Sequence, residues 1–144
     1  MALFTSARLS LLNGEINWLS GTIKCALVKN YSQNTAHVYL SSVTGAGGIV
    51  ANATTLTGKG LVAATSPTSA LYQASNVTMN SSPNDIANNY YLLLYQSSAP
   101  AGGADLATSA QRLIAYITSG TYMPIQPLGG IVSIAWGGYV LWVL

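Results

Sequence analysis

Apolar and polar residues alternate along this chain in short runs, and no helical period continues over a long stretch. Residues 22–29 alternate with a period of two and place Lys24 on the face opposite three apolar side chains, which predicts a strand. Residues 89–96 give the strongest strand prediction, because they are apolar on both faces. Such a strand lies in the centre of a sheet or packs one face against another subunit.

Other short runs of the same kind predict strands at 52–56, 61–64, 75–79 and 111–118. Residues 3–12 and 35–43 fit either a short helix or extended chain. Short strands separated by turn residues indicate an all-β fold. We therefore predict a single-domain β-sandwich over residues 1–144, jelly-roll-like, with at most a short helix near the N-terminus or at 35–43; the length suits eight strands.

The C-terminal region holds two apolar runs, 130–136 and 139–144, on either side of Gly137 and Gly138. Glycine adopts the positive φ angles that tight hairpin turns require, so this arrangement predicts a β-hairpin. Its last strand is apolar on both faces, and an exposed edge of that kind pairs with other chains. We therefore expect that strand to be covered.

The composition is unusual in its lack of ionic side chains. Charged residues make up 6% of the 144 residues, whereas about a quarter is typical of soluble domains. Apolar residues make up 50%, which excludes a disordered chain solvated by charge. Five Lys and Arg against three Asp and Glu give a net charge of +2, and this scattered charge argues against nucleic-acid binding.

Candidate chemistry is sparse, and no catalytic motif is present. We therefore expect no enzyme activity and assign no catalytic, cofactor-binding or metal-binding residue, since one His and one Cys cannot build a metal site in one chain. Cys25 alternates with apolar residues, which predicts a buried, unreactive thiol. His37 is predicted to be a hydrogen-bonded structural residue, because no orienting partner is indicated. Glu15, Asp85 and Asp105 are predicted to be turn or capping groups.

Residues 113–144 contain no charged side chain, yet Pro124, Pro127 and two glycine pairs interrupt the apolar runs. The uninterrupted pieces are far shorter than the roughly 20 residues of a membrane-spanning helix. The first residues also lack the basic start and long apolar run of a secretory signal. We expect neither a membrane span nor a signal peptide.

Aromatic residues are abundant, with nine Tyr and three Trp. The simpler interpretation is core packing, and we expect burial of Trp18, Tyr91, Tyr95, Tyr116 and Trp136. The alternative is an interface, because interface centres are poor in charge and rich in aromatic side chains. A folded monomer with so few ions would have low solubility. We therefore expect much of the surface to be buried in a permanent assembly.

An ordered series of short motifs runs from about residue 10 to the end of the chain. It begins with Asn-Gly-Glu-Ile-Asn-Trp at 13–18 and continues through 22–28, 37–43, 56–59, 91–95, 113–117 and 127–131, together with Trp136. In this order the series resembles a family of small tailed-phage virion structural proteins, of the capsid decoration or cement-like kind.

The resemblance implies a component of the virion that is made in the host cytoplasm and located on the capsid surface. It implies a homo-oligomer, with a trimer favoured, that binds the major capsid protein and needs no cofactor. Two alternatives stay open: a tail or neck structural protein, and a capsid-displayed module that binds glycans through aromatic and amide side chains.

Overall fold

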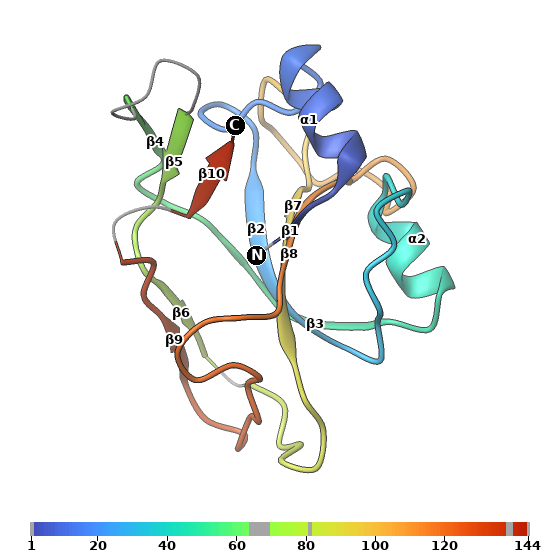
Figure 1. Ribbon diagram of the computed structural model, residues 1–144, viewed down its shortest axis with the longest axis vertical. Helices are drawn as coiled ribbons and strands as arrows, with labels where there is room; N and C mark the ends of the chain where they lie inside the picture. The colour runs from blue at the N-terminus through green and yellow to red at the C-terminus, as the bar shows by residue number, and fades with distance from the viewer. Residues whose placement is uncertain (1, 64–69, 81, 138–139, 144) are drawn as a thin grey trace.

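The computed structural model describes residues 2–63, 70–80, 82–137 and 140–143. Within these ranges the chain forms short strands and two short helices, which confirms the predicted all-β class (Figure 1). The helices are α1 (Thr5–Leu12) and α2 (Leu40–Gly45). Both lie in or next to the two stretches for which the sequence allowed a helix, and residues 35–39 precede α2 as turn and extended chain.

The strands are β1 (Ala2–Leu3), β2 (Ile23–Lys29), β3 (Ile49–Thr55), β4 (Gly60–Ala63), β5 (Ala70–Gln73), β6 (Val77–Met79), β7 (Tyr91–Gln96), β8 (Arg112–Ile117), β9 (Val132–Ile134) and β10 (Leu141–Val143). All pairs between them are antiparallel. They form a five-stranded sheet with the order β1-β8-β7-β2-β3, a three-stranded sheet β10-β5-β4, and a two-stranded sheet β6-β9. A regular eight-stranded jelly roll would instead divide its strands into two larger sheets.

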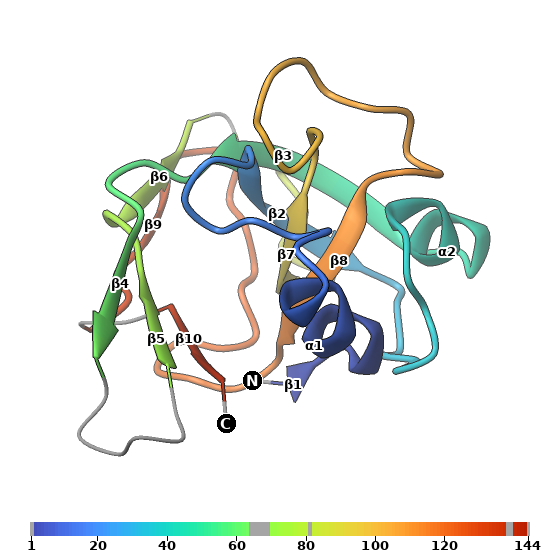
Figure 2. The same cartoon turned by 90° about the horizontal axis from the view of Figure 1, so that it is seen from above.

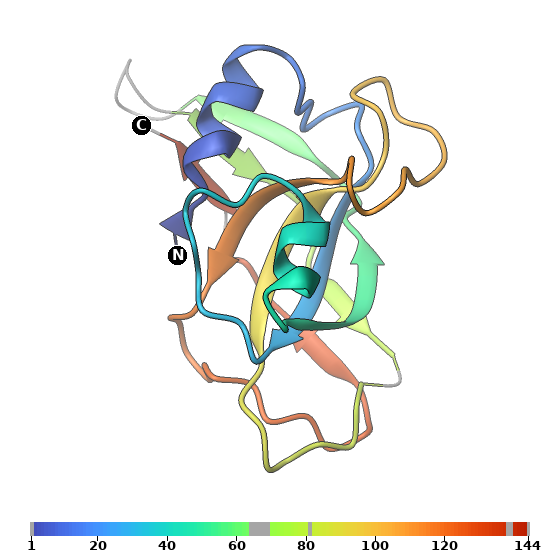
Figure 3. The same cartoon turned by 90° about the vertical axis from the view of Figure 1, so that its right-hand side faces the viewer.

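The five-stranded sheet is the central layer of the molecule. Figure 2 shows the two small sheets on one side of it and both helices on the other, and Figure 3 views the sheet from the helix side. Strands β2, β7 and β8 are therefore buried along almost their whole length. The prediction that residues 89–96 form a central strand is confirmed, because β7 pairs with β8 on one side and β2 on the other.

The predicted C-terminal hairpin is wrong. Strand β9 pairs with β6, with Val77 opposite Ile134, and β10 pairs with β5, with Leu141 opposite Tyr72. Gly137 does have a positive φ of 65°, but it leads the chain from one small sheet to the other. The second glycine of the predicted turn and the first residue of the predicted last strand, at positions 138 and 139, lie outside the described residues. Strands β9 and β10 therefore pair with strands that come earlier in the sequence and not with each other.

Strand β3 contains a bulge next to the centre of β2. The register shifts between the pairs Cys25–Thr54 and Leu27–Ala51, so that β3 contributes one residue more than β2. Asn52 lies in this extra stretch with a φ of 52°, a left-handed conformation that Asn tolerates better than most residues. The strand begins three residues earlier than the predicted 52–56, because the bulge allows the edge strand to continue.

Candidate functional site

The three carboxylates lie apart, and each forms an ion pair with a different base. Lys24 pairs with Asp105 and Lys29 pairs with Asp85. Arg112 holds Glu15 through its Nη2, 3.1 Å from the Glu15 Oε1. The described residues thus contain no paired carboxylates suited to acid–base catalysis. In the same ranges, no three His, Cys, Asp or Glu side chains are grouped as metal ligands.

Asp85 lies at a turn, as predicted, and also forms an ion pair with Lys29 that the sequence did not indicate. Its Oδ1 accepts a hydrogen bond of 2.7 Å from the Asn88 side chain, and its Oδ2 accepts one of 3.0 Å from the Tyr90 hydroxyl. The Lys29 ammonium also donates to Asp85 and lies 5.4 Å from the centre of the Tyr90 ring. Hydrogen bonds from Lys29 and Asn88 lower the pKa of Asp85 to about 2.

This network predicts a pH-dependent stability. Because the pKa of Asp85 is below its ordinary value of about 3.9, the pair stabilises the fold above pH 4 or so and loses its effect as the pH falls toward about 2. Lys29→Met should therefore lower the free energy of unfolding at neutral pH, and its deficit should shrink in acid. Urea titrations at several pH values measure this.

The matched control is Lys24→Met, because Asp105, the partner of Lys24, is more exposed than Asp85. Solvent screens an exposed pair more strongly, so its loss should cost less. A deficit in Lys29→Met that stays constant from neutral pH down to about 2 would contradict the pairing.

His37 is hydrogen-bonded, as predicted, and lies beside Tyr31. Its Nδ1 is 3.0 Å from the Tyr31 hydroxyl, and its carbonyl accepts a hydrogen bond of 3.1 Å from Ser6. The Tyr116 hydroxyl donates to the Tyr31 carbonyl at 2.9 Å. These contacts fasten the segment after β2 onto the five-stranded sheet, which is a structural role.

Cys25 is fully buried in β2, as predicted. Burial strongly raises the pKa of its thiol, because a thiolate there would lose its hydration. The thiol therefore stays protonated and is a poor nucleophile.

Neither helix of the described chain is long and apolar enough to cross a membrane.

The aromatic residues divide between core and surface. Trp18, Tyr95 and Tyr116 are buried as predicted, whereas Tyr91 and Trp136 are only half-buried. Trp18 packs edge-on against Tyr72, with ring centres 5.3 Å apart, and its indole N–H donates to the Gln73 carbonyl. Tyr122 is the opposite case, because it is 91% exposed and has a φ of 68°.

Most of the exposed large apolar side chains of the described chain occur at two ends of the molecule. We call Leu9, Leu12 and Leu19 the helix-end patch, since they lie on α1 and the loop that follows it. We call Ile86, Tyr122, Leu128 and Ile131 the loop-end patch. Figure 1 shows α1 at the top and the loops joining β6 to β7 and β8 to β9 at the bottom. Ile49, Leu61 and Leu106 lie elsewhere in the sequence.

The two loops that carry the loop-end patch are joined to each other. Asn84 forms an antiparallel bridge with Leu128, and Tyr90 forms one with Ile125. The only charged residue in segments 80–90 and 118–131 is Asp85, which Lys29 neutralises. The four apolar side chains of the loop-end patch therefore lie on two hydrogen-bonded loops whose one charge, on Asp85, is paired.

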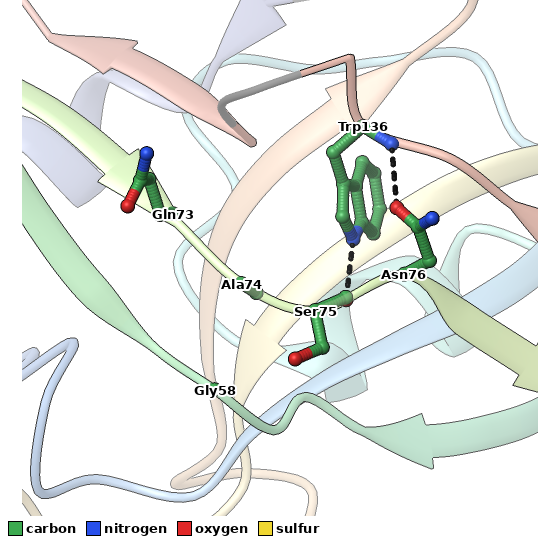
Figure 4. Close-up of a pocket in the computed structure, with 6 residues that line it drawn as sticks. All are labelled: Gly58, Gln73, Ala74, Ser75, Asn76 and Trp136. Carbon is green, nitrogen blue, oxygen red and sulfur yellow. Dashed lines mark hydrogen bonds between the residues drawn. The ribbon is translucent and has the colours of Figure 1, made fainter.

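A shallow cleft of about 460 Å³ lies beside Trp136, between the loop before β4 and the chain that follows β5 (Figure 4). Its polar groups include side chains of Gln73, Ser75 and Asn76. The Trp136 indole N–H donates to the Ser75 carbonyl at 3.0 Å, and the Trp136 backbone N–H donates to the Asn76 Oδ1 at 3.2 Å. These bonds fix the indole and already occupy part of the hydrogen-bonding capacity that a glycan would use.

Sequence reasoning anticipated the abundance of aromatic and uncharged surface but not its location. Tyr122 gave no signal, because its neighbours Gly120 and Pro124 indicate an ordinary turn. The apolar residues of the two patches likewise lie in loops or on α1, and the sequence pattern of these segments does not indicate which apolar side chains are exposed.

Comparisons with protein-family models, curated proteins and solved structures give no match to this chain.

Proposed function

We propose that this chain is a phage virion structural protein, a capsid decoration or cement protein. It binds the outer shell as a homo-oligomer and stabilises contacts between major capsid subunits. The observation that carries the proposal is the presence of two apolar patches at opposite ends of a nearly uncharged molecule. A subunit that holds a shell together must contact at least two partners at once, and separate patches permit this.

The few charges of the molecule support an interface of apolar and amide groups. All three carboxylates are paired within the chain, and Lys59 donates to the Gly21 carbonyl. The three carboxylates are therefore already used within the chain, and the bases that form no ion pair among the described residues are Arg8 and Lys59. Contact with a neutral partner surface requires no loss of charge hydration, and such contacts are characteristic of permanent interfaces.

We assign the helix-end patch to contact between copies and the loop-end patch to the shell. Leu9 and Leu12 are three residues apart on α1, a spacing that suits packing of one helix against another. The loop-end patch contains Tyr122, and exposed Tyr side chains are common anchors at interfaces with other proteins. The accessible surface of 7131 Å² can accommodate both contacts, since a standard interface covers about 800 Å² per partner.

The mechanism is mechanical. Packaged genome presses outward on the shell, and shell subunits held by one oligomer cannot separate without breaking its contacts. Each contact can be weak, because engagement at several points of a symmetric oligomer raises the effective concentration of the others.

The test is the number of copies of this chain in purified particles before and after a wash in about 1 M salt, where ion pairs at the surface are screened. Hundreds of copies that resist the wash are expected for a decoration protein. Loss of the protein in salt would contradict a neutral interface, tens of copies would indicate the tail or neck, and absence from particles would overturn a virion role. Binding on a glycan array would instead favour a glycan-binding module at the Trp136 cleft.

A further inference from the structure

A cavity of about 800 Å³ lies between the five-stranded sheet and the segment that leads from β8 to β10. Leu92 of β7 and Ile117 of β8 line its sheet side. Ile125, Ile134 and Val140 are among the apolar residues that line its other walls. The cavity and the cleft of Figure 4 have different lining residues, except that Trp136 lines both.

The volume of this cavity lies in the range of small-molecule sites. Ligand pockets in proteins typically have volumes of about 300–1,000 Å³ and mainly apolar walls with a few polar groups. Water fills cavities well only where it finds several polar partners. The sheet side, formed by Leu92 and Ile117, offers few such partners, so an apolar group of a ligand would replace water there at little cost.

The polar groups of the lining define the charge of the ligand. They come from hydroxyl and amide side chains, including Thr121, Gln126 and Ser133. No acid and no base is among the described residues that line the cavity. A charged ligand would lose hydration there without gaining a counter-charge, which is unfavourable. Neutral hydrogen-bonding groups of a ligand can be satisfied by the hydroxyls and the amide.

Tyr122 and Ile131 line the cavity and are also 91% and 69% exposed. They therefore form part of its opening to solvent. Tyr122 holds a left-handed backbone conformation, which is unfavourable for a bulky residue and is found chiefly where function or packing requires it. An aromatic side chain held outward at the opening leaves the interior accessible.

We propose that this cavity binds a neutral, mainly apolar small molecule with few hydrogen-bonding groups. This inference goes beyond the role in the virion and concerns the free chain, because Tyr122 and Ile131 at the opening also belong to the loop-end patch that we assign to the shell. The ligand class follows from the volume, the apolar walls and the uncharged polar groups.

The experiment compares two fluorescent probes that share one ring system. N-phenyl-1-naphthylamine is neutral, and 1-anilinonaphthalene-8-sulfonate adds a sulfonate to the same skeleton. The full chain should bind the neutral probe with one site per chain, and the sulfonate at least about tenfold more weakly, a difference of about 1.4 kcal/mol. Equal affinity for the two probes, or no saturable binding of the neutral one, would overturn the proposal.

Substitutions locate the bound probe. Ala135 is exposed and lines the cavity, so Ala135→Trp should fill part of the volume and weaken binding at least about tenfold. The matched control is Ala87→Trp, on an exposed turn outside the cavity, and it should bind as the natural chain does. Circular dichroism and thermal unfolding identify a variant that fails to fold.

Two further variants keep the outcome interpretable. Ser133→Lys places a cation in the lining and should raise the affinity for the sulfonate probe, a change that general unfolding would not produce for one probe alone. Leu128→Asp alters the loop-end patch but not the cavity lining, and should leave neutral-probe binding unchanged. Weaker binding in Leu128→Asp alone would place the probe on the patch and overturn the cavity site, whatever the outcome of the particle experiment.

Discussion

Leu128→Asp is expected to release the protein from the shell, with a loss of affinity of about 30-fold or more, which corresponds to a hot-spot contribution of at least about 2 kcal/mol. Leu128 is 69% exposed, and Lys29, the base that reaches the facing loop at Asp85, is already paired. The substitution removes apolar contact area and also places an uncompensated charge in the interface. Co-sedimentation of the purified variant with undecorated particles measures the loss.

The control for this prediction is Ser109→Asp, an equal change of charge at an exposed position in the loop between β7 and β8. It should bind particles as the natural chain does, while both variants keep the same thermal stability because neither side chain is buried. If Leu128→Asp binds particles as well as Ser109→Asp does, the loop-end patch is not the shell contact.

Gln96→Leu is expected to destabilise the fold by about 3 kcal/mol, because it leaves three backbone groups without their side-chain partner, one of them the carbonyl of the buried Ser98. The Gln96 side chain is 2% exposed at the end of β7. Its Oε1 accepts from the Asn17 backbone N–H at 2.8 Å, and its Nε2 donates to the carbonyls of Glu15 and Ser98, both at 3.1 Å. One amide thus ties the loop after α1 to the end of a central strand.

Urea or thermal unfolding measures this loss, and Gln126→Leu is the matched control. Gln126 is exposed and its Nε2 makes one hydrogen bond of 3.3 Å to the Asn89 side chain, so its replacement should change stability by less than about 0.5 kcal/mol. If the two glutamine variants have equal stability, the Gln96 network does not hold the loop.

The parts of the fold that could be predicted are those whose pattern is local. The period-two run at 22–29 and the doubly apolar run at 89–96 become β2 and β7, because each pattern has one favourable burial arrangement in a sheet covered on both sides. Strand β5, residues 70–73, was not predicted, since four residues with no clear alternation give little signal. The C-terminal hairpin was wrong because the choice of strand partner depends on residues 53–73 positions away in the sequence.

The candidate sites show the same limit. The buried thiol of Cys25 and the hydrogen-bonded His37 could be predicted, because burial and lack of a nearby base are local properties. The Lys29–Asp85 pair joins residues 56 positions apart, and no spacing rule indicates it. The loop-end patch combines segments before β7 and after β8, and the cavity combines β7, β8 and the segment after β8, so both exist only once the chain is folded.

The most direct test of the central claim is the mass of the purified chain in solution, measured by light scattering from about 10 µM to about 1 mM in both moderate and molar salt, where exposed ion pairs are screened. We predict a homo-oligomer, with the trimer as the expected form, that persists in molar salt and is weakened by Leu12→Asp on the helix-end patch. A soluble monomer of 15.0 kDa at every concentration would contradict the claim that this uncharged surface is an assembly surface.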